Sequence, residues 1–190
     1  MGSLLRARRA RAVATDCVQE SLESLSEHII GTHHAYVKRE LPRLALLAQK
    51  VVNRHGATTA ELPVVQATLA KLDEELTQHL AKEEAILFPY VVLLERASAN
   101  GSPKPRGGFQ SVASPIAMMT QEHDAAGALL ADIRRLSNSF TTPSDACPTY
   151  RAFYDGLKDF ERDLHQHIHL ENNILFPRAI ELEACSTSRE

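Results

Sequence analysis

Apolar residues recur at helical spacing through most of the chain, and the strict alternation typical of strands is nearly absent. Two stretches rich in Gly, Pro, Ser and Thr, residues 97–114 and 141–148, interrupt this pattern and are predicted to be loops. The pattern predicts four long helices, over residues 17–54, 62–96, 114–138 and 149–183.

Four amphipathic helices with connections of modest length are typical of an antiparallel four-helix bundle, so an all-α fold is predicted. Pro63 and Pro115 fall at the start of predicted helices, where the missing N–H of proline costs nothing. Pro42 falls inside the first helix and is expected to kink or interrupt it. The chain also divides into two helical hairpins related by a pseudo-two-fold axis, one from each half.

The second helix of each hairpin carries the same motif. Residues 79–89 read HLAKEEAILFP and residues 167–177 read HIHLENNILFP, so HxxxExxILFP occurs twice, 88 positions apart. Because a helix turns 100° per residue, the His, the Glu and the following Ile should share one core-facing side. These residues are His79, Glu83 and Ile86 in the first copy, and His167, Glu171 and Ile174 in the second.

The first helix of each hairpin carries a matching histidine. His34 lies 45 residues before His79, and His123 lies 44 residues before His167. Each half therefore contributes one lone histidine followed by an HxxxE pair. Together the halves would bring four imidazoles and two carboxylates to the centre of the bundle.

A buried imidazole or carboxylate is costly unless it has a partner, and metal ions would supply that partner. Each of two ions can take two imidazoles, while the two carboxylates bridge them. Imidazole with carboxylate and no thiolate favours iron, manganese or zinc. The ILFP part of the motif is predicted to pack in the core, and its prolines, Pro89 and Pro177, are expected to bend or end the ligand helix.

The remaining histidines are distinguished by helical geometry. His165 and His169 lie about 200° from His167 around the helix and are expected to face solvent. His34 is preferred over its neighbour His33 through the spacing of the repeat alone. His28 is assigned to the surface. His55 lies about 31 Å from His34 along a straight first helix and is therefore expected to be out of reach of the site.

Three acids are candidates to accept a hydrogen bond from the outer N–H of a ligand imidazole and so to fix its tautomer. Two of them precede an HxxxE histidine by one helical turn, and the third directly precedes the histidine of the third helix. Plain surface acids are an equal alternative at all three positions. Glu84 is turned 140° from His79 and is not a candidate. The three candidates are Glu75, Asp163 and Glu122.

Four segments resemble a known family: HHAYVKRELPRL, EELTQHLAKEEAILFP, QEHDAAGALL and LHQHIHLENNILFP, in this order. They are similar to the hemerythrin-like di-iron domain of the iron–sulfur cluster repair proteins, also called repair of iron centres, over residues 20–182. The resemblance implies a pair of iron ions joined by an oxo or hydroxo bridge. It implies iron ligands at His34, His79, Glu83, His123, His167 and Glu171.

The resemblance also implies a function in nitrosative and oxidative stress. The protein is expected to bind nitric oxide at the iron pair, to reduce it, or to supply iron to apo iron–sulfur proteins, and these acts stay open. Family members usually carry an N-terminal domain with a cysteine pair, whereas only Cys17 precedes His34 here. Roles that depend on that domain are therefore in doubt.

An alternative is a hemerythrin-like protein without enzymatic activity that binds oxygen or stores iron. Oxygen carriers of this kind use a further HxxxH on the third helix and end in HxxxxD. This chain has Gly127 four residues after His123, and HxxxE in place of HxxxxD, so both differences argue against oxygen carriage. A structural bundle that binds zinc is a third interpretation.

Composition limits the number of domains, the classes of partner and the compartment, but it indicates no particular reaction. A length of 190 residues suits one domain, and a net charge of −3 gives no general attraction to nucleic acid or to an anionic membrane. Three cysteines without CxxC spacing suggest a reducing compartment, and a cytoplasmic location is expected. The predicted organisation is a disordered basic arm over 1–16, the di-iron bundle over 17–183 and a tail over 184–190.

Overall fold

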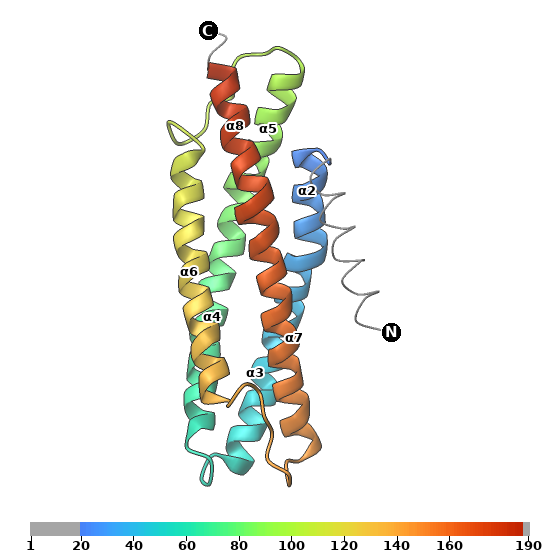
Figure 1. Ribbon diagram of the computed structural model, residues 1–190, viewed down its shortest axis with the longest axis vertical. Helices are drawn as coiled ribbons and strands as arrows, with labels where there is room; N and C mark the ends of the chain where they lie inside the picture. The colour runs from blue at the N-terminus through green and yellow to red at the C-terminus, as the bar shows by residue number, and fades with distance from the viewer. Residues whose placement is uncertain (1–19, 188–190) are drawn as a thin grey trace.

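The computed structural model describes residues 20–187 (Figure 1). Over that range the chain contains helices and no strand, and it runs up and down as four long antiparallel rods. The predicted all-α four-helix bundle is confirmed. No helix in this range is long and apolar enough to cross a membrane. The predicted basic arm, residues 1–16, lies outside the described residues.

Three of the four rods consist of two α-helices joined by a π-helical segment of five residues, and the third rod is the single helix α6. In chain order the elements are α2 (Leu22–Ile29), η1 (Ile30–His34), α3 (Ala35–His55), α4 (Glu61–Lys82), η2 (Glu83–Leu87), α5 (Phe88–Ala99), α6 (Ala113–Leu136), α7 (Pro148–Leu170), η3 (Glu171–Leu175) and α8 (Phe176–Thr187). Helix α8 therefore continues four residues beyond the boundary expected at residue 183.

The first helix is fixed at its start by side chains that replace missing backbone partners. Ser21 is the N-cap of α2, and its hydroxyl accepts a hydrogen bond from the Ser24 N–H at 3.0 Å. The carboxylate of Glu95, on α5, accepts from the N–H groups of Leu22 and Glu23 at 2.7 and 2.9 Å. A negative charge is favourable at the positive end of a helix, so Glu95 ties the start of α2 to the second rod.

The π-helical segments begin or end at the residues that form the functional site. In each segment the N–H of the residue that follows it bonds the carbonyl five residues earlier, which inserts one extra residue into the turn. The three bonds join Ala35 to Ile30, Phe88 to Glu83 and Phe176 to Glu171.

The structure corrects two expectations from the sequence. Ile86 was expected on the core face but is 54% exposed, whereas Phe88, two residues later, is buried. Pro42 was expected to kink or interrupt the first helix; it lies inside α3, which continues through it, and the change from α-helix occurs earlier, at η1. The η1 turn allows two consecutive histidines, His33 and His34, to be buried together.

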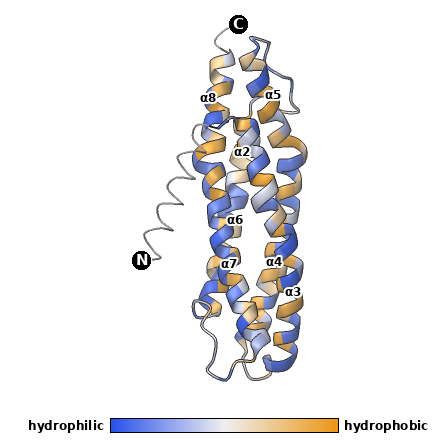
Figure 2. Ribbon diagram, turned by 90° about the vertical axis from the view of Figure 1, so that its right-hand side faces the viewer, coloured by the Kyte–Doolittle hydropathy of each residue, from blue (hydrophilic) through white to orange (hydrophobic). Residues whose placement is uncertain are grey.

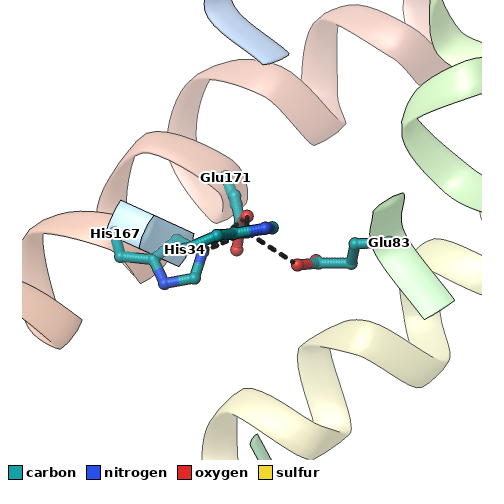
Figure 3. A group of neighbouring side chains, drawn as sticks. All are labelled: His34, Glu83, His167 and Glu171. Carbon is teal, nitrogen blue, oxygen red and sulfur yellow. Dashed lines mark hydrogen bonds and ion pairs between the residues drawn. The ribbon is translucent and has the colours of Figure 1, made fainter. Parts of the chain in front are cut away.

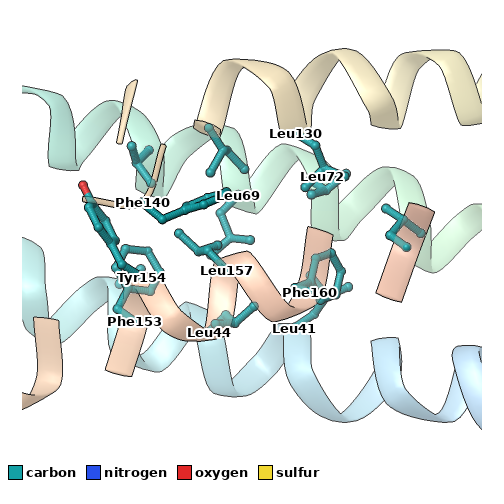
Figure 4. Close-up of a cluster of buried hydrophobic side chains, with 14 of the residues drawn as sticks. Leu41, Leu44, Leu69, Leu72, Leu130, Phe140, Phe153, Tyr154, Leu157 and Phe160 are labelled. Atoms are coloured by element: carbon teal, nitrogen blue, oxygen red, sulfur yellow. The ribbon is translucent and has the colours of Figure 1, made fainter. Parts of the chain in front are cut away.

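Apolar side chains form two separate clusters along the bundle, and hydrophobic and hydrophilic residues alternate along every rod (Figure 2). One cluster fills the space between α3, α4, α6 and α7, where Leu and Phe side chains meet at the bundle axis (Figure 4). The other lies between α2, α5, α8 and the start of α6. Each fully buried Leu or Phe in these clusters contributes about 1.5–3 kcal/mol.

Candidate metal centre

Six ionisable side chains from all four rods meet between the two apolar clusters, and each is at most 4% exposed. They are the six residues that the repeat selected from the sequence: His34, His79, Glu83, His123, His167 and Glu171. Two of them, Glu83 and Glu171, are the first residues of η2 and η3. The π-helical turns therefore present the two carboxylates to the bundle axis.

One half of the centre contains His34, His167 and both glutamates (Figure 3). The Nε2 atoms of His34 and His167 lie 3.2 Å apart. Glu171 Oε1 is 2.8 Å from His167 Nε2 and 3.8 Å from His34 Nε2. Glu83 Oε2 is 3.4 Å from His34 Nε2, so both carboxylates reach this pair of imidazoles.

The other half contains His79, His123 and the same two glutamates. The two imidazole Nε2 atoms lie 3.0 Å apart. Glu83 Oε2 is 3.3 Å from His79 Nε2, and Glu171 Oε2 is 3.0 Å from His123 Nε2. Each half thus has two imidazoles of its own and shares both carboxylates, which is the arrangement expected for two bridged metal ions.

Three of the four imidazoles make a hydrogen bond through the nitrogen that faces away from the centre. Each bond fixes the proton on Nδ1, so Nε2 carries a lone pair that points inward. His34 Nδ1 donates to Glu84 at 2.8 Å, His79 Nδ1 donates to Glu122 at 2.9 Å, and His123 Nδ1 donates to Asn172 at 2.9 Å.

Two lysines hold the outer carboxylates in their ionised form. Lys38 contacts both oxygens of Glu84 at 2.7 Å, and Lys82 forms an ion pair with Glu122. Burial alone would raise the pKa of each acid, but hydrogen bonds from the lysine and from the imidazole outweigh it and lower the pKa. The outer carboxylates therefore stay charged, which increases the basicity of the imidazoles they orient.

The inner atoms lack partners that protein groups could provide. Both oxygens of Glu83 and one oxygen of Glu171 are buried and make no well-aligned hydrogen bond among the described residues; the imidazole Nε2 atoms of the centre are their charged or polar neighbours. The facing Nε2 atoms present lone pairs to one another at about hydrogen-bond distance. Only a cation can satisfy this set, so the residues fit a metal pair.

The pKa shifts show that the centre attracts positive charge. Burial favours the neutral imidazole of His34, but hydrogen bonds and charges from Glu171 and Glu83 outweigh it and raise its pKa to about 9. Burial also opposes the ionised form of Glu171, yet the imidazoles around it hold its pKa well below the usual range.

The two phenylalanines of the ILFP motif flank the centre. The ring of Phe88 stacks on His34 with centroids 5.6 Å apart, and the ring of Phe176 stacks on His123 at 6.0 Å. Pro89 and Pro177 follow these rings within the first turn of α5 and α8, and neither ends its rod. The repeated ILFP therefore packs against histidines of the centre as well as in the core.

The structure separates the three candidate outer acids. Glu122 accepts from a ligand imidazole, as described above. Asp163 accepts instead from Nδ1 of His33 at 3.1 Å, and not from His167. Glu75 forms an ion pair with Lys71 at 3.6 Å and touches no histidine.

Two outer partners were missed from the sequence. Glu84 was excluded by its angle from His79, but it bonds His34 on the neighbouring rod, and Asn172 bonds His123 in the same way. Both residues directly follow the glutamate of the motif, 88 positions apart. Their matched places in the repeat were the available signal.

The other histidines lie outside the two metal-binding groups. His165 and His169 are exposed, as expected. His55, at the end of α3, faces Cys147 with 3.4 Å between Nε2 and Sγ. His33 is buried and its ring stacks parallel to that of His167, with centroids 5.7 Å apart.

A cavity of about 320 Å³ between α4 and α6 reaches one side of the centre. Its lining includes His79, Lys82 and Glu122, so a small molecule or ion in it would lie next to one ligand imidazole.

Comparison with known proteins agrees with this geometry. A family model described as the hemerythrin HHE cation binding domain matches residues 25–179. The iron-sulfur cluster repair protein YtfE of Yersinia pseudotuberculosis serotype IB (strain PB1/+) is 41% identical over 165 residues, which cover 87% of this chain and 69% of that protein. YtfE of Yersinia pestis (strain Pestoides F) matches with the same identity and coverage. The chain therefore belongs to the hemerythrin HHE domain family and, within it, to the iron–sulfur cluster repair proteins.

Proposed function

We propose that this protein holds two iron ions at the bundle centre and acts in the repair of iron–sulfur clusters damaged by nitric oxide or oxidants. The observation that carries the proposal is the donor set: four imidazoles and two shared carboxylates, all buried. One ion would take His34 and His167, and the other would take His79 and His123. Glu83 and Glu171 would bridge them.

The choice of iron rests on chemistry and on the family. Imidazole with carboxylate suits iron, manganese and zinc, and the relatives are named for iron–sulfur cluster repair. When bound, the iron pair would supply a coordination position for nitric oxide and iron that can pass to an apo iron–sulfur protein. Both acts are part of the proposal.

The residues around the centre contribute in three ways. Glu84, Glu122 and Asn172 orient the imidazoles through their outer nitrogens. The Phe88 and Phe176 rings exclude water from two of them. The lysines keep the outer acids Glu84 and Glu122 ionised, while Glu83 and Glu171 are the carboxylates that would face the ions.

Anaerobic titration of the reduced protein with nitric oxide, followed by electron paramagnetic resonance, tests the first act. The expected result is an iron–nitrosyl signal that is weaker in His123→Ala and unchanged in the surface variant His169→Ala. Incubation with an apo iron–sulfur enzyme under reducing conditions tests the second act, with recovery of that enzyme's cluster as the readout.

An oxygen-binding protein would behave differently. It would take up oxygen reversibly and would pass no iron to an acceptor. Reduced protein that gives no iron–nitrosyl signal and loses no iron to the apo enzyme would overturn the proposed function, even if two irons are present.

A further inference from the structure

The two halves of the metal centre are not equally supported from outside. In the half formed by His79 and His123, both imidazoles have an outer hydrogen-bond acceptor, Glu122 and Asn172. In the half formed by His34 and His167, only His34 has one. The Nδ1 of His167 is buried and has no hydrogen-bond partner among residues 20–187.

The difference arises at one position of the internal repeat. Glu122, which accepts from His79, directly precedes the lone histidine of the second half. The equivalent position in the first half, 89 residues earlier, is His33. His33 stacks flat on His167, with 5° between the rings, and directs its own Nδ1 to Asp163. An aromatic ring thus occupies the place where the other half has a carboxylate.

An outer hydrogen bond matters for metal affinity because it fixes the ring and makes the inner nitrogen more basic. Loss of such a partner typically weakens metal binding by about 10–100-fold. The His34 and His167 half also leaves the Nε2 of His33 buried and without a partner beside it. That half therefore binds its ion less firmly.

We propose that the two irons are held unequally, and that the iron bound by His34 and His167 is the one the protein gives up, while the iron bound by His79 and His123 stays. This inference rests on the proposed two-iron function and specifies which ion is the cargo. His33 acts as the positioning residue that makes the first half labile, because it withholds an acceptor from His167.

Release of iron from the reduced, fully loaded chain to a ferrous chelator tests the proposal. Two phases of one iron each are expected, with the fast phase at least about 10-fold faster than the slow one. Anomalous scattering from crystals of the one-iron form should place the retained ion at His79 and His123. Release in a single phase, or an ion retained at His34 and His167, would overturn the proposal.

Two variants change the asymmetry in opposite directions. His33→Gln supplies an amide oxygen where Glu122 stands in the other half, and its NH₂ group can still donate to Asp163, so the fast phase should slow towards the slow one. Glu122→Ala removes the acceptor from His79, so the slow phase should accelerate by about 10-fold or more.

Two controls separate this effect from simple damage. His33→Ala removes the ring without adding an acceptor and should leave the fast phase at least as fast as in the unmodified chain. Asp124→Ala changes an exposed acid next to His123 and should leave both phases unchanged. If His33→Ala slowed the fast phase, the lability of this iron could not be due to the missing hydrogen-bond acceptor for His167.

The iron content measured before release distinguishes a failure of the proposed two-iron function from a failure of the proposed unequal binding. A chain that binds fewer than two irons contradicts the proposed function. A chain with two irons that leave together contradicts only the asymmetry. Circular dichroism of each variant shows whether the bundle has kept its helices, and the unmodified chain tests the proposal even if one variant fails to fold.

Discussion

At the scale of single residues, the role of each histidine follows from what its ring nitrogens meet. His167 directs Nε2 to Glu171 at 2.8 Å in the buried centre, whereas His165 and His169, two residues away on either side, are exposed. His167→Ala should lose iron, while His165→Ala and His169→Ala should keep it. Iron analysis by mass spectrometry checks this, and full iron in His167→Ala would show that the wrong face of α7 was chosen.

A second prediction at this scale concerns pH. The hydrogen bond from His55, together with backbone N–H groups at the start of α7, lowers the pKa of the Cys147 thiol to about 7. The reactive thiolate therefore forms as the pH rises through about 7. Alkylation of Cys147 by iodoacetamide, followed by peptide mass spectrometry, should reach half its maximal rate near that pH.

His55→Ala is the matched control for this prediction. Without the imidazole the midpoint should move up towards the ordinary thiol value of about 8.5. An unchanged midpoint would show that the N-terminus of α7, and not His55, sets the reactivity of Cys147.

At the scale of elements, the surroundings of the two π-helical segments decide whether the Ile of the motif is buried. The two copies are identical in ILFP, yet Ile174 is 7% exposed and Ile86 is 54% exposed. Both segments rotate the following Phe inward. Ile174 stays covered because it belongs to the apolar cluster around α2, α5 and α8, whereas Ile86 lies on the rim of a surface groove beside Met118.

This difference gives a paired prediction for stability. Ile174→Ala should lower the free energy of unfolding by about 2–4 kcal/mol, because it opens a cavity in a packed cluster. Ile86→Ala should change it by less than about 0.5 kcal/mol, because the side chain contacts mainly solvent. Urea unfolding followed by circular dichroism measures both, and equal losses would contradict the different burial of the two side chains.

At the scale of the whole molecule, the bundle holds a polar centre between two apolar clusters. Four imidazoles and two carboxylates buried together are costly without cations, so metal binding and folding should be linked. Iron-loaded protein should contain two irons per chain. At a free iron concentration 100 times the dissociation constant, each site would add about 2.7 kcal/mol to the free energy of unfolding. This raises the melting temperature by about 5 °C or more.

Removal of iron with a chelator tests this link directly. The melting temperature of the stripped protein should fall and should recover when ferrous iron is returned. The variant His123→Ala should show a smaller fall, because it starts with less iron. One iron per chain, or stoichiometric zinc in protein from iron-replete cells, would contradict the paired-iron proposal.

The sequence by itself determined the fold class and the six inner residues, because both follow from periodicity. Helical spacing of apolar residues specifies rods, and a motif repeated 88 positions apart specifies which polar residues share their buried faces. The choice of His34 over His33 needed only the offset between the halves. These features are local or repeat along the chain, so an ideal helix describes them well.

Only the tertiary structure decided what surrounds those six residues. Glu84 and Asn172 reach imidazoles on neighbouring rods, Asp163 turns to His33, and Ile86 turns to solvent. The physical reason is that the outer hydrogen bonds cross between rods whose relative rotation is set by packing. The π-helical turns also add a residue where an ideal helix has none, so angles counted along the sequence are wrong beyond Glu83 and Glu171.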